Sequence, residues 1–197
     1  MRRIAYLTAL LLAVAAFNAS ANEAEVRAAS LQAVEEGLVL NADFAFELSQ
    51  RLEEIVANGV PLYFRVEFEL TRRRWYWLDE KAASRQLQLR LSYHALSRHY
   101  RLSSGLLQQN FATLAEALNV LKRVRNWLVV DRTETFSDAD YEAAVRLRLD
   151  AGMLPRPFQL SALTSRELQL ESAWKRFSVR PTQTPAPVES RNPQEPR

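Results

Sequence analysis

The chain has 197 residues, of which 48% are hydrophobic, enough to form one domain with its own core. It contains no cysteine, which excludes disulfide bonds, thiolate catalysis and cysteine-ligated metals. Basic residues number 26 against 23 acidic ones, and two of them, Arg2 and Arg3, belong to an expected leader. The remaining charges are nearly balanced, which disfavours nucleic acid as a partner.

Residues 1–21 have the layout of a secretory signal peptide. Arg2 and Arg3 precede the apolar run Ile4–Phe17, and Ala19-Ser20-Ala21 supplies the small residues of a cleavage site. The apolar run is shorter than the roughly 20 residues of a membrane-spanning helix, and no later run is longer. We therefore expect a periplasmic protein that is cut after Ala21 and has no transmembrane segment after cleavage.

The first elements after the leader are two strands and a short helix. Strands are predicted over Val26–Ala33 and Leu38–Leu48, on either side of a turn at Glu35–Gly37. Ser49 is a suitable N-cap for the helix, which Asn58-Gly59 would end. The apolar stripe of this helix is Leu52, Ile55 and Val56.

The clearest strand pattern begins at Leu62. Every second residue is apolar, and these residues are Leu62, Phe64, Val66, Phe68 and Leu70. Such alternation predicts a strand with one buried face. If it continued, Arg72 and Arg74 would be buried, which is prohibitive for unpaired guanidinium groups. We therefore predict a bulge or bend between Thr71 and Trp75 that returns Trp75 and Trp77 to the apolar face.

The next segment is predicted to form further strands. Asp79–Ser84 is interpreted as a loop. Apolar positions predict strands at Leu87–Tyr93 and Leu107–Phe111, with turns near His94–Ser97 and at Ser103–Gly105.

One helix is indicated more clearly than any other. Thr113 and Glu116 form a capping box at its start. Its apolar stripe is Leu114, Ala117, Leu118, Leu121 and Val124. We expect it to end near Asn126, with Lys122, Arg123 and Arg125 at the negative end of the helix dipole.

The C-terminal part contains the last predicted strands, Trp127–Val130, Tyr141–Leu149 and Trp174–Val179. Asp131–Asp140 is interpreted as a polar loop, and Gly152–Pro157 as irregular. The pattern over Leu160–Leu170 does not distinguish a helix from a strand. Residues 181–197 hold five of the eight prolines of the chain, which predicts a disordered, extended tail.

Half-buried strands joined by short connections are typical of antiparallel pairing. We predict one α+β domain over residues 22–180, mostly antiparallel β, with one well-marked helix and one short helix. A curved sheet and a two-sheet sandwich both fit this pattern.

Candidate chemical groups are few. His94 and His99 lack the spacing of a metal motif, and surface histidines beside a turn explain them. The acidic positions Asp131, Glu134, Asp138, Asp140 and Glu142 do not match a calcium loop and are interpreted as a solvated loop. No nucleophile elbow or glycine-rich phosphate loop occurs. The sequence therefore predicts no catalytic residue, metal or cofactor.

The cluster Arg72-Arg73-Arg74-Trp75-Tyr76-Trp77 is the candidate binding surface. Arginine and aromatic side chains dominate interface hot spots and membrane-interface belts. Alternatively, the tryptophans are core residues and the arginines pair with Asp79, Glu80 or a neighbouring strand.

Several segments resemble the bacterial domain of unknown function 4390 family, namely LYFRVEFELTRRRWYWLD, LRLSYHALSRHYRLS, FATLAEAL and LPRPFQLSALTSRELQLESAWKRF. The resemblance covers roughly Glu25 to Val179. It implies an exported bacterial protein without an assigned activity, in a family often encoded beside a membrane sensor kinase of the nitrogen-regulation type. The expected function is that of an exported, non-enzymatic interaction module of the cell envelope, with an envelope protein or the membrane surface as its partner. A periplasmic small-ligand-binding protein or hydrolase is the alternative.

Overall fold

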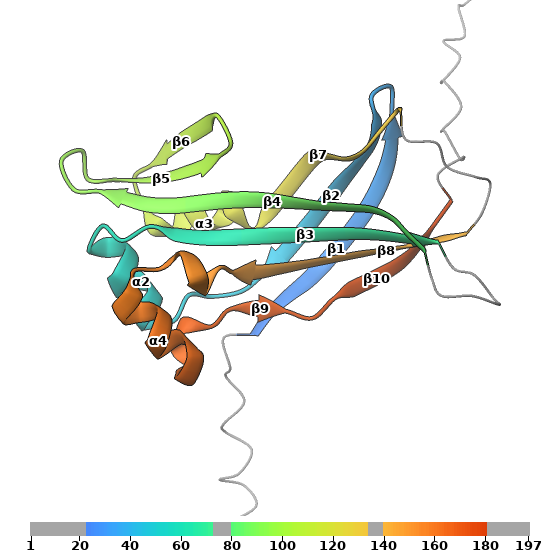
Figure 1. The fold of residues 1–197 in the computed structure, drawn as a ribbon. Coiled ribbons are helices and arrows are strands. Elements are labelled where there is room, and N and C mark those ends of the chain that lie inside the picture. The colour runs from blue at the N-terminus through green and yellow to red at the C-terminus, as the bar shows by residue number, and fades with distance from the viewer. Residues whose placement is uncertain (1–22, 73–79, 134–139, 181–197) are drawn as a thin grey trace, which may run out of the picture.

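The computed structural model describes residues 23–72, 80–133 and 140–180, which form one ten-stranded sheet with three α-helices (Figure 1). The strands are β1 (Glu23–Val34), β2 (Gly37–Ala45), β3 (Leu62–Arg72), β4 (Glu80–His94), β5 (His99–Ser104), β6 (Leu107–Phe111), β7 (Arg123–Asp131), β8 (Tyr141–Leu149), β9 (Glu171–Ser172) and β10 (Lys175–Val179). The helices are α2 (Gln50–Ala57), α3 (Leu114–Leu121) and α4 (Arg156–Thr164).

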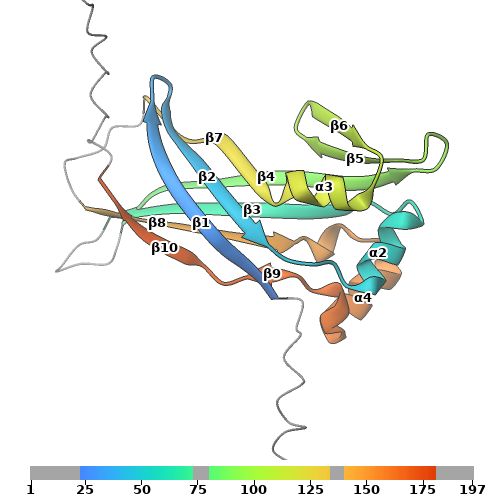
Figure 2. The ribbon, with the colours of Figure 1, turned by 180° about the vertical axis from the view of Figure 1, so that it is seen from behind.

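The sheet is mixed and strongly curled. Its strand order is β6-β5-β4-β3-β8-β9-β1-β2-β7, and β10 pairs with β8 next to β9. The pairs are antiparallel except for β1 with β9, which run parallel. In Figure 2 the strands β1, β2 and β7 cross over β3, β4 and β8, so the sheet forms an open half-barrel. The mostly antiparallel β prediction is confirmed, and of the two architectures left open the curved sheet is the one observed.

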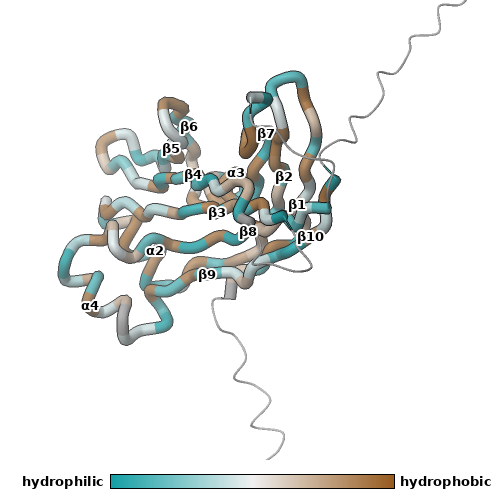
Figure 3. The backbone as a smooth tube through the Cα atoms, turned by 45° about the vertical axis from the view of Figure 1, so that its right-hand side comes forward, coloured by the Kyte–Doolittle hydropathy of each residue, from teal (hydrophilic) through white to brown (hydrophobic). Residues whose placement is uncertain are grey.

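The core lies inside this curl and is organised around β3, between β4 and β8. The predicted apolar row of β3 is fully buried, with every member at 0% exposure: Leu62, Phe64, Val66, Phe68 and Leu70. Figure 3 shows the corresponding alternation of hydrophilic and hydrophobic residues along the strands. The period-two pattern therefore predicted the buried face correctly.

A register break occurs near the predicted place. Between Leu70 and Thr71 the pairing with β4 shifts by one residue, and Ala82 of β4 is the extra residue. The pairing of β3 with β8 stays regular as far as Arg72. The break is thus slightly earlier than predicted and its extra residue is on β4. Residues 73–79 lie outside the described residues, so the return of Trp75 and Trp77 to the apolar face stays a prediction.

The starts of two helices agree with the sequence signals. Ser49 Oγ accepts a hydrogen bond from the Leu52 amide at 3.2 Å at the start of α2. Thr113 Oγ1 accepts from the Glu116 amide at 3.2 Å at the start of α3, and the Glu116 carboxylate accepts from the Ala112 amide. No helix in the described ranges has both the length and the apolar character needed to cross a membrane.

The end of α3 differs from the prediction. The helix stops at Leu121, and residues predicted as its last turns belong to β7, which pairs with β2. Arg125 donates to the Ala42 carbonyl at 3.0 Å and contacts the Asp43 carboxylate. Asn126 has a positive φ of 51°, which a continuing helix does not allow. Long-range pairing with β2 therefore outweighs the local helical pattern.

Two other segments also differ. Residues from Glu80 onward, predicted as loop, form the first part of β4, because they pair with the end of β3. Helix α4 begins at Arg156, within the segment interpreted as irregular, and continues into the undecided segment, so the described chain has three α-helices and not two. Pro157 lies in the first turn of α4, where a missing amide hydrogen costs little.

Candidate functional site

Of the predicted binding surface, the structure describes only Arg72, and Arg73, Arg74, Trp75, Tyr76 and Trp77 lie outside the described residues. Arg72 is the half-buried last residue of β3. It is opposite Glu80 of β4 and Tyr141 of β8. Tyr141 is in turn opposite Val179 of β10. Arg72 therefore lies beside Tyr141 and Val179 on neighbouring strands, at the edge of the sheet where β3 and β10 both end.

The sheet is interrupted beside this row. β1 and β9 pair only through Glu23 and Ala24, and β10, which continues in the direction of β9, pairs with β8 alone. Figures 1 and 2 both show β1 and β10 diverging from β9 onward. We call this gap, between Glu25–Val34 of β1 and Lys175–Val179 of β10, the seam. Each of the two strands presents to the seam an edge that no other described strand pairs.

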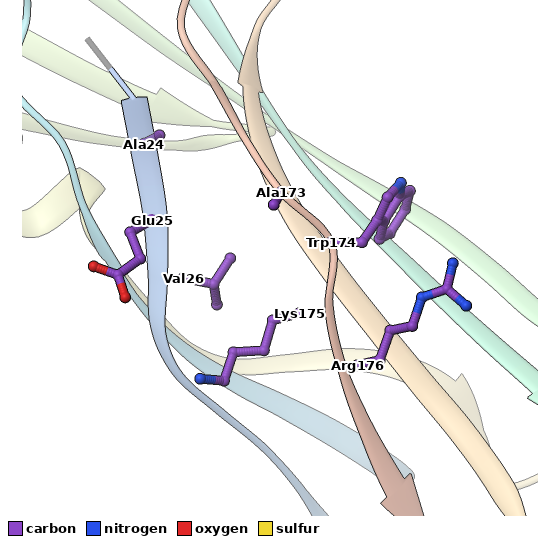
Figure 4. Close-up of a pocket in the computed structure, with 7 residues that line it drawn as sticks. All are labelled: Ala24, Glu25, Val26, Ala173, Trp174, Lys175 and Arg176. Atoms are coloured by element: carbon purple, nitrogen blue, oxygen red, sulfur yellow. The ribbon is translucent and has the colours of Figure 1, made fainter. Parts of the chain in front are cut away.

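The seam begins in a groove of about 590 Å³. It is lined by Ala24, Glu25, Val26, Ala173, Trp174, Lys175 and Arg176. Figure 4 shows Trp174 and Arg176 on the β8 side of β10, whereas the Lys175 side chain extends from β10 toward β1. The groove therefore combines backbone edges with aromatic and cationic side chains.

Lys175 bridges the seam. It lies opposite the buried Val145 of β8, on the same face of β10 as Phe177 and Val179. Those two side chains are half-buried and pack against the core. The exposed Lys175 instead donates from Nζ to the Arg27 carbonyl of β1 at 3.3 Å. An inward-facing lysine on an edge strand discourages indiscriminate pairing.

A bulge separates β9 from β10 and positions Trp174. Ser172 is buried, and its Oγ accepts a hydrogen bond from the Leu147 amide at 3.0 Å, in place of a backbone carbonyl. Trp174 then stacks on Arg146, whose guanidinium carbon lies 4.6 Å from the ring centroid. The hydroxyl of Ser172 therefore lets the chain leave the regular ladder without an unsatisfied amide.

The Arg146 that supports Trp174 belongs to a buried charge cluster. Glu67 of β3 is only 7% exposed, and it accepts hydrogen bonds from Arg146 at 2.7 Å and Arg148 at 2.8 Å. Burial alone would raise the pKa of the Glu67 carboxyl, but the hydrogen bonds and charges of the two arginines outweigh it and lower that pKa. Arg146 also pairs with Glu171 at 2.5 Å. These ion pairs therefore fix the position of the Arg146 side chain on which Trp174 stacks.

The histidines lie opposite each other on β4 and β5, and both are exposed. His94 Nδ1 is 3.1 Å from Ser97 Oγ, and His99 Nδ1 contacts the Ser97 carbonyl oxygen. The interpretation as surface histidines beside a turn is confirmed.

The acidic positions are dispersed where the structure describes them. Asp131 accepts hydrogen bonds from the Thr133 amide at 2.9 Å and hydroxyl at 2.8 Å, which lower the pKa of its carboxyl. Asp140 pairs with Arg180 and Glu142 with Arg176, while Glu134 and Asp138 lie outside the described residues. Within the described ranges, no group of three or more aspartate, glutamate and histidine side chains is placed to hold a metal ion.

Sequence reasoning missed the seam, because a strand edge is defined by which strands pair and not by the residues of one strand. One signal was available. Lys175 interrupts an otherwise apolar row in the last predicted strand, the row that continues at Phe177 and Val179. An inward charge at that place indicates an edge strand.

Comparisons with known proteins place the chain in a family. A family model described as "Domain of unknown function (DUF4390)" matches residues 21–178, a range that includes almost all of the curled sheet. A search of curated proteins and a search of solved structures find no match. The protein is therefore a member of the DUF4390 family.

Proposed function

We propose that this protein is an exported, non-enzymatic binding module of the bacterial cell envelope, and that it binds an extended segment of another envelope protein in the seam. The observation that carries the proposal is a pair of strand edges, one of β1 and one of β10, that no described strand pairs and that face the same gap. Adding a strand to an exposed sheet edge is a recurrent mode of peptide recognition.

The orientation of the two edges suits a single guest strand. β1 runs parallel to β9, and β10 continues in the direction of β9 along β8. One guest can therefore be antiparallel to both edges, which is the slightly more stable pairing. Its apolar side chains would meet the core-facing row of Phe177 and Val179. A guest carboxylate would meet the Lys175 ammonium, which now bridges to Arg27.

The absence of native cysteine allows a site-specific test. A single Ala173→Cys change, alkylated with a benzophenone maleimide, attaches a photocrosslinker in the exposed lining of the groove. Ala57→Cys, an exposed alanine at the end of α2 and outside the seam, is the matched control. Irradiation in cells should join an envelope protein to the first variant and not to the second, with the crosslink in an extended segment of the partner. Equal adducts from both positions, or none from Ala173→Cys, would reject the proposal.

The arginine cluster is a second surface for the same partner. The row Val179–Tyr141–Arg72 connects β10 to the end of β3, so a guest that leaves the seam at this end passes near Arg72. Replacing Arg72, Arg73 and Arg74 together by glutamine should leave the melting temperature nearly unchanged and reduce recovery of the crosslinked partner. Unchanged recovery would remove the cluster from the proposed interface and leave the seam to act alone.

The first partner to test is the exported region of a membrane sensor kinase, because the family is often encoded beside one. Purified sensor region and this protein should form a complex that the Ala173→Cys crosslink captures. If another envelope protein is captured instead, the module remains and its assignment to the sensor is wrong.

A further inference from the structure

A second surface, distant from the seam in strand order, has an unusual charge composition. Between Glu80 and Glu116 the sequence contains no aspartate or glutamate. The same segment holds both histidines of the chain and five basic residues, Lys81, Arg85, Arg90, Arg98 and Arg101. We define the cationic wing as residues Gln86–Phe111, which comprise the second half of β4, β5, β6 and the turns that join them.

Strand register brings the polar side chains of the cationic wing onto one face. Arg90 is opposite Ser103, Arg101 is opposite Ser92, and His94 is opposite His99. Gln108 and Asn110 of β6 extend the same face. The other face carries Leu91 and Leu102, which are buried in the core. The outer face of the wing is therefore cationic or neutral throughout.

The arginines of this face have no carboxylate partner within the described ranges. Arg90 lies over the Tyr63 ring, 5.9 Å from its centroid. Arg101 Nε donates to Asn110 Oδ1 at 3.2 Å, and Arg98 is exposed in the β4–β5 turn. The carboxylate of Glu53 in α2 affects Tyr100, whose side chain packs against the core. Burial, Tyr93 and this carboxylate together raise the pKa of Tyr100.

An exposed leucine marks the end of the wing. Leu96 is 94% exposed in the turn between β4 and β5, flanked in sequence by His94, Arg98 and His99. This turn extends to the end of the molecule (Figures 1 and 2). The opposite end of β5 has a comparable leucine, Leu106, which is 102% exposed but is followed by uncharged residues up to Phe111. The two leucines therefore differ in their charged surroundings and not in exposure.

We propose that the cationic wing binds the surface of an anionic phospholipid membrane through its outer face and its β4–β5 turn, with Leu96 inserted at the level of the headgroups and the β5–β6 turn, which holds Leu106, outside the contact. Arg98 and Arg101 would contact lipid phosphates, and Arg90 would extend the contact along β4. Basic residues beside an exposed apolar side chain are the combination by which peripheral proteins bind anionic bilayers. Leucine is under-represented among the hot spots of protein interfaces, so a single exposed leucine at a turn favours a lipid surface over a protein.

Vesicle sedimentation tests the proposal with the exported chain. The probe is phosphatidylcholine vesicles with and without phosphatidylglycerol. Binding should require phosphatidylglycerol and weaken with added salt, because exposed charges are screened. Each arginine near an anionic surface contributes about fivefold in affinity, so Arg98→Gln with Arg101→Gln should weaken binding by about 25-fold.

The leucines provide a matched pair. Leu96→Ser should weaken binding several-fold, whereas Leu106→Ser should leave it unchanged. Circular dichroism and melting of each variant should match the parent chain, because Leu96, Leu106 and Arg98 are exposed and Arg101 is only partly buried.

Three outcomes would overturn the proposal. The first is equal binding to vesicles with and without phosphatidylglycerol. The second is an equal loss with Leu96→Ser and Leu106→Ser. The third is that the chain binds soluble polyglutamate but not vesicles, and that Arg98→Gln with Arg101→Gln abolishes the binding to polyglutamate. That result would assign the wing to an acidic protein. None of these outcomes depends on whether the seam binds a guest strand.

Discussion

Two regions on the outer face of the same sheet differ in whether their arginines pair with carboxylates. On β3 and β8 three arginines pair with carboxylates, since Arg146 and Arg148 pair with Glu67, and Arg65 pairs with Asp150. On the cationic wing, Arg90, Arg98 and Arg101 have no such partner within the described residues. Both regions are rich in arginine and built from paired antiparallel strands.

The difference separates a structural use of charge from a binding use. A buried carboxylate with two guanidinium partners is satisfied within the fold and has little left to offer a ligand. An arginine without a carboxylate partner keeps its charge available to an outside anion. The lack of acidic residues in the wing is visible in its amino-acid composition, but the pairing of Arg146 and Arg148 with Glu67 is visible only in the structure.

The largest expected effect tests the core beneath the region of β3 and β8 in which arginines pair with carboxylates, called the compensated region below. Phe68 is fully buried on β3, on the opposite face from its neighbour Glu67. Phe68→Ala should lower the free energy of unfolding by about 3–5 kcal/mol, because it empties an aromatic core position. Leu107→Ala in the wing, a residue that is 73% exposed, should change it by less than about 0.5 kcal/mol. Chemical denaturation of both variants measures the contrast, and similar losses would show that the wing is part of the core.

The next effect comes from removing the compensation itself. Glu67→Gln keeps the size of the side chain but leaves Arg146 with Glu171 alone and Arg148 without a negative partner among the described residues. The free energy of unfolding at neutral pH should fall by about 1–3 kcal/mol, the usual value of charge-assisted hydrogen bonds with a largely buried group. A loss near zero would mean that solvent replaces the carboxylate, and the compensated region would then resemble the wing.

The same variant should change the pH dependence of stability. The folded pKa of the Glu67 carboxyl is lowered from its ordinary value of 4.5. Its stabilising contribution is therefore complete above pH 4.5 and is lost as the pH falls through the folded pKa. The difference in stability between the parent chain and Glu67→Gln should shrink over this acidic range and stay constant above it. A difference that persists unchanged at low pH would contradict the lowered pKa.

The smallest expected effect concerns the contribution of the arginines of the cationic wing to the stability of the fold. Arg90→Gln with Arg101→Gln should change the free energy of unfolding by less than about 0.5 kcal/mol per residue, because neither guanidinium has a charged partner in the part of the chain that the structure describes. Thermal melting measures this. A larger loss would show that the arginines stabilise the fold, for example through the ring of Tyr63, and would weaken the contrast between the two regions.

Much of the local structure could be predicted from the sequence. The alternation from Leu62 to Leu70 depends only on which face of a strand is buried, and the hydroxyls of Ser49 and Thr113 cap helices through bonds to amides three residues away. These signals act between near neighbours along the chain. They were therefore visible without knowledge of the fold.

Other features were decided by tertiary pairing. The local pattern favoured helix as far as Asn126, but β2 offered a partner and Arg123 became the start of β7. Residues from Glu80 carried no strand pattern of their own and joined the sheet because the end of β3 lay beside them.

By itself the sequence determined the buried face of the central strand, the starts of the helices and the resemblance to the family. The tertiary structure decided where the sheet ends and which charges face each other. The seam exists because β10 pairs with β8 and β1 with β2, and the cationic face exists because register aligns Arg90, His94 and Arg101. Strand pairing joins residues far apart in the chain, and no local periodicity encodes the partner of an edge or of a charge.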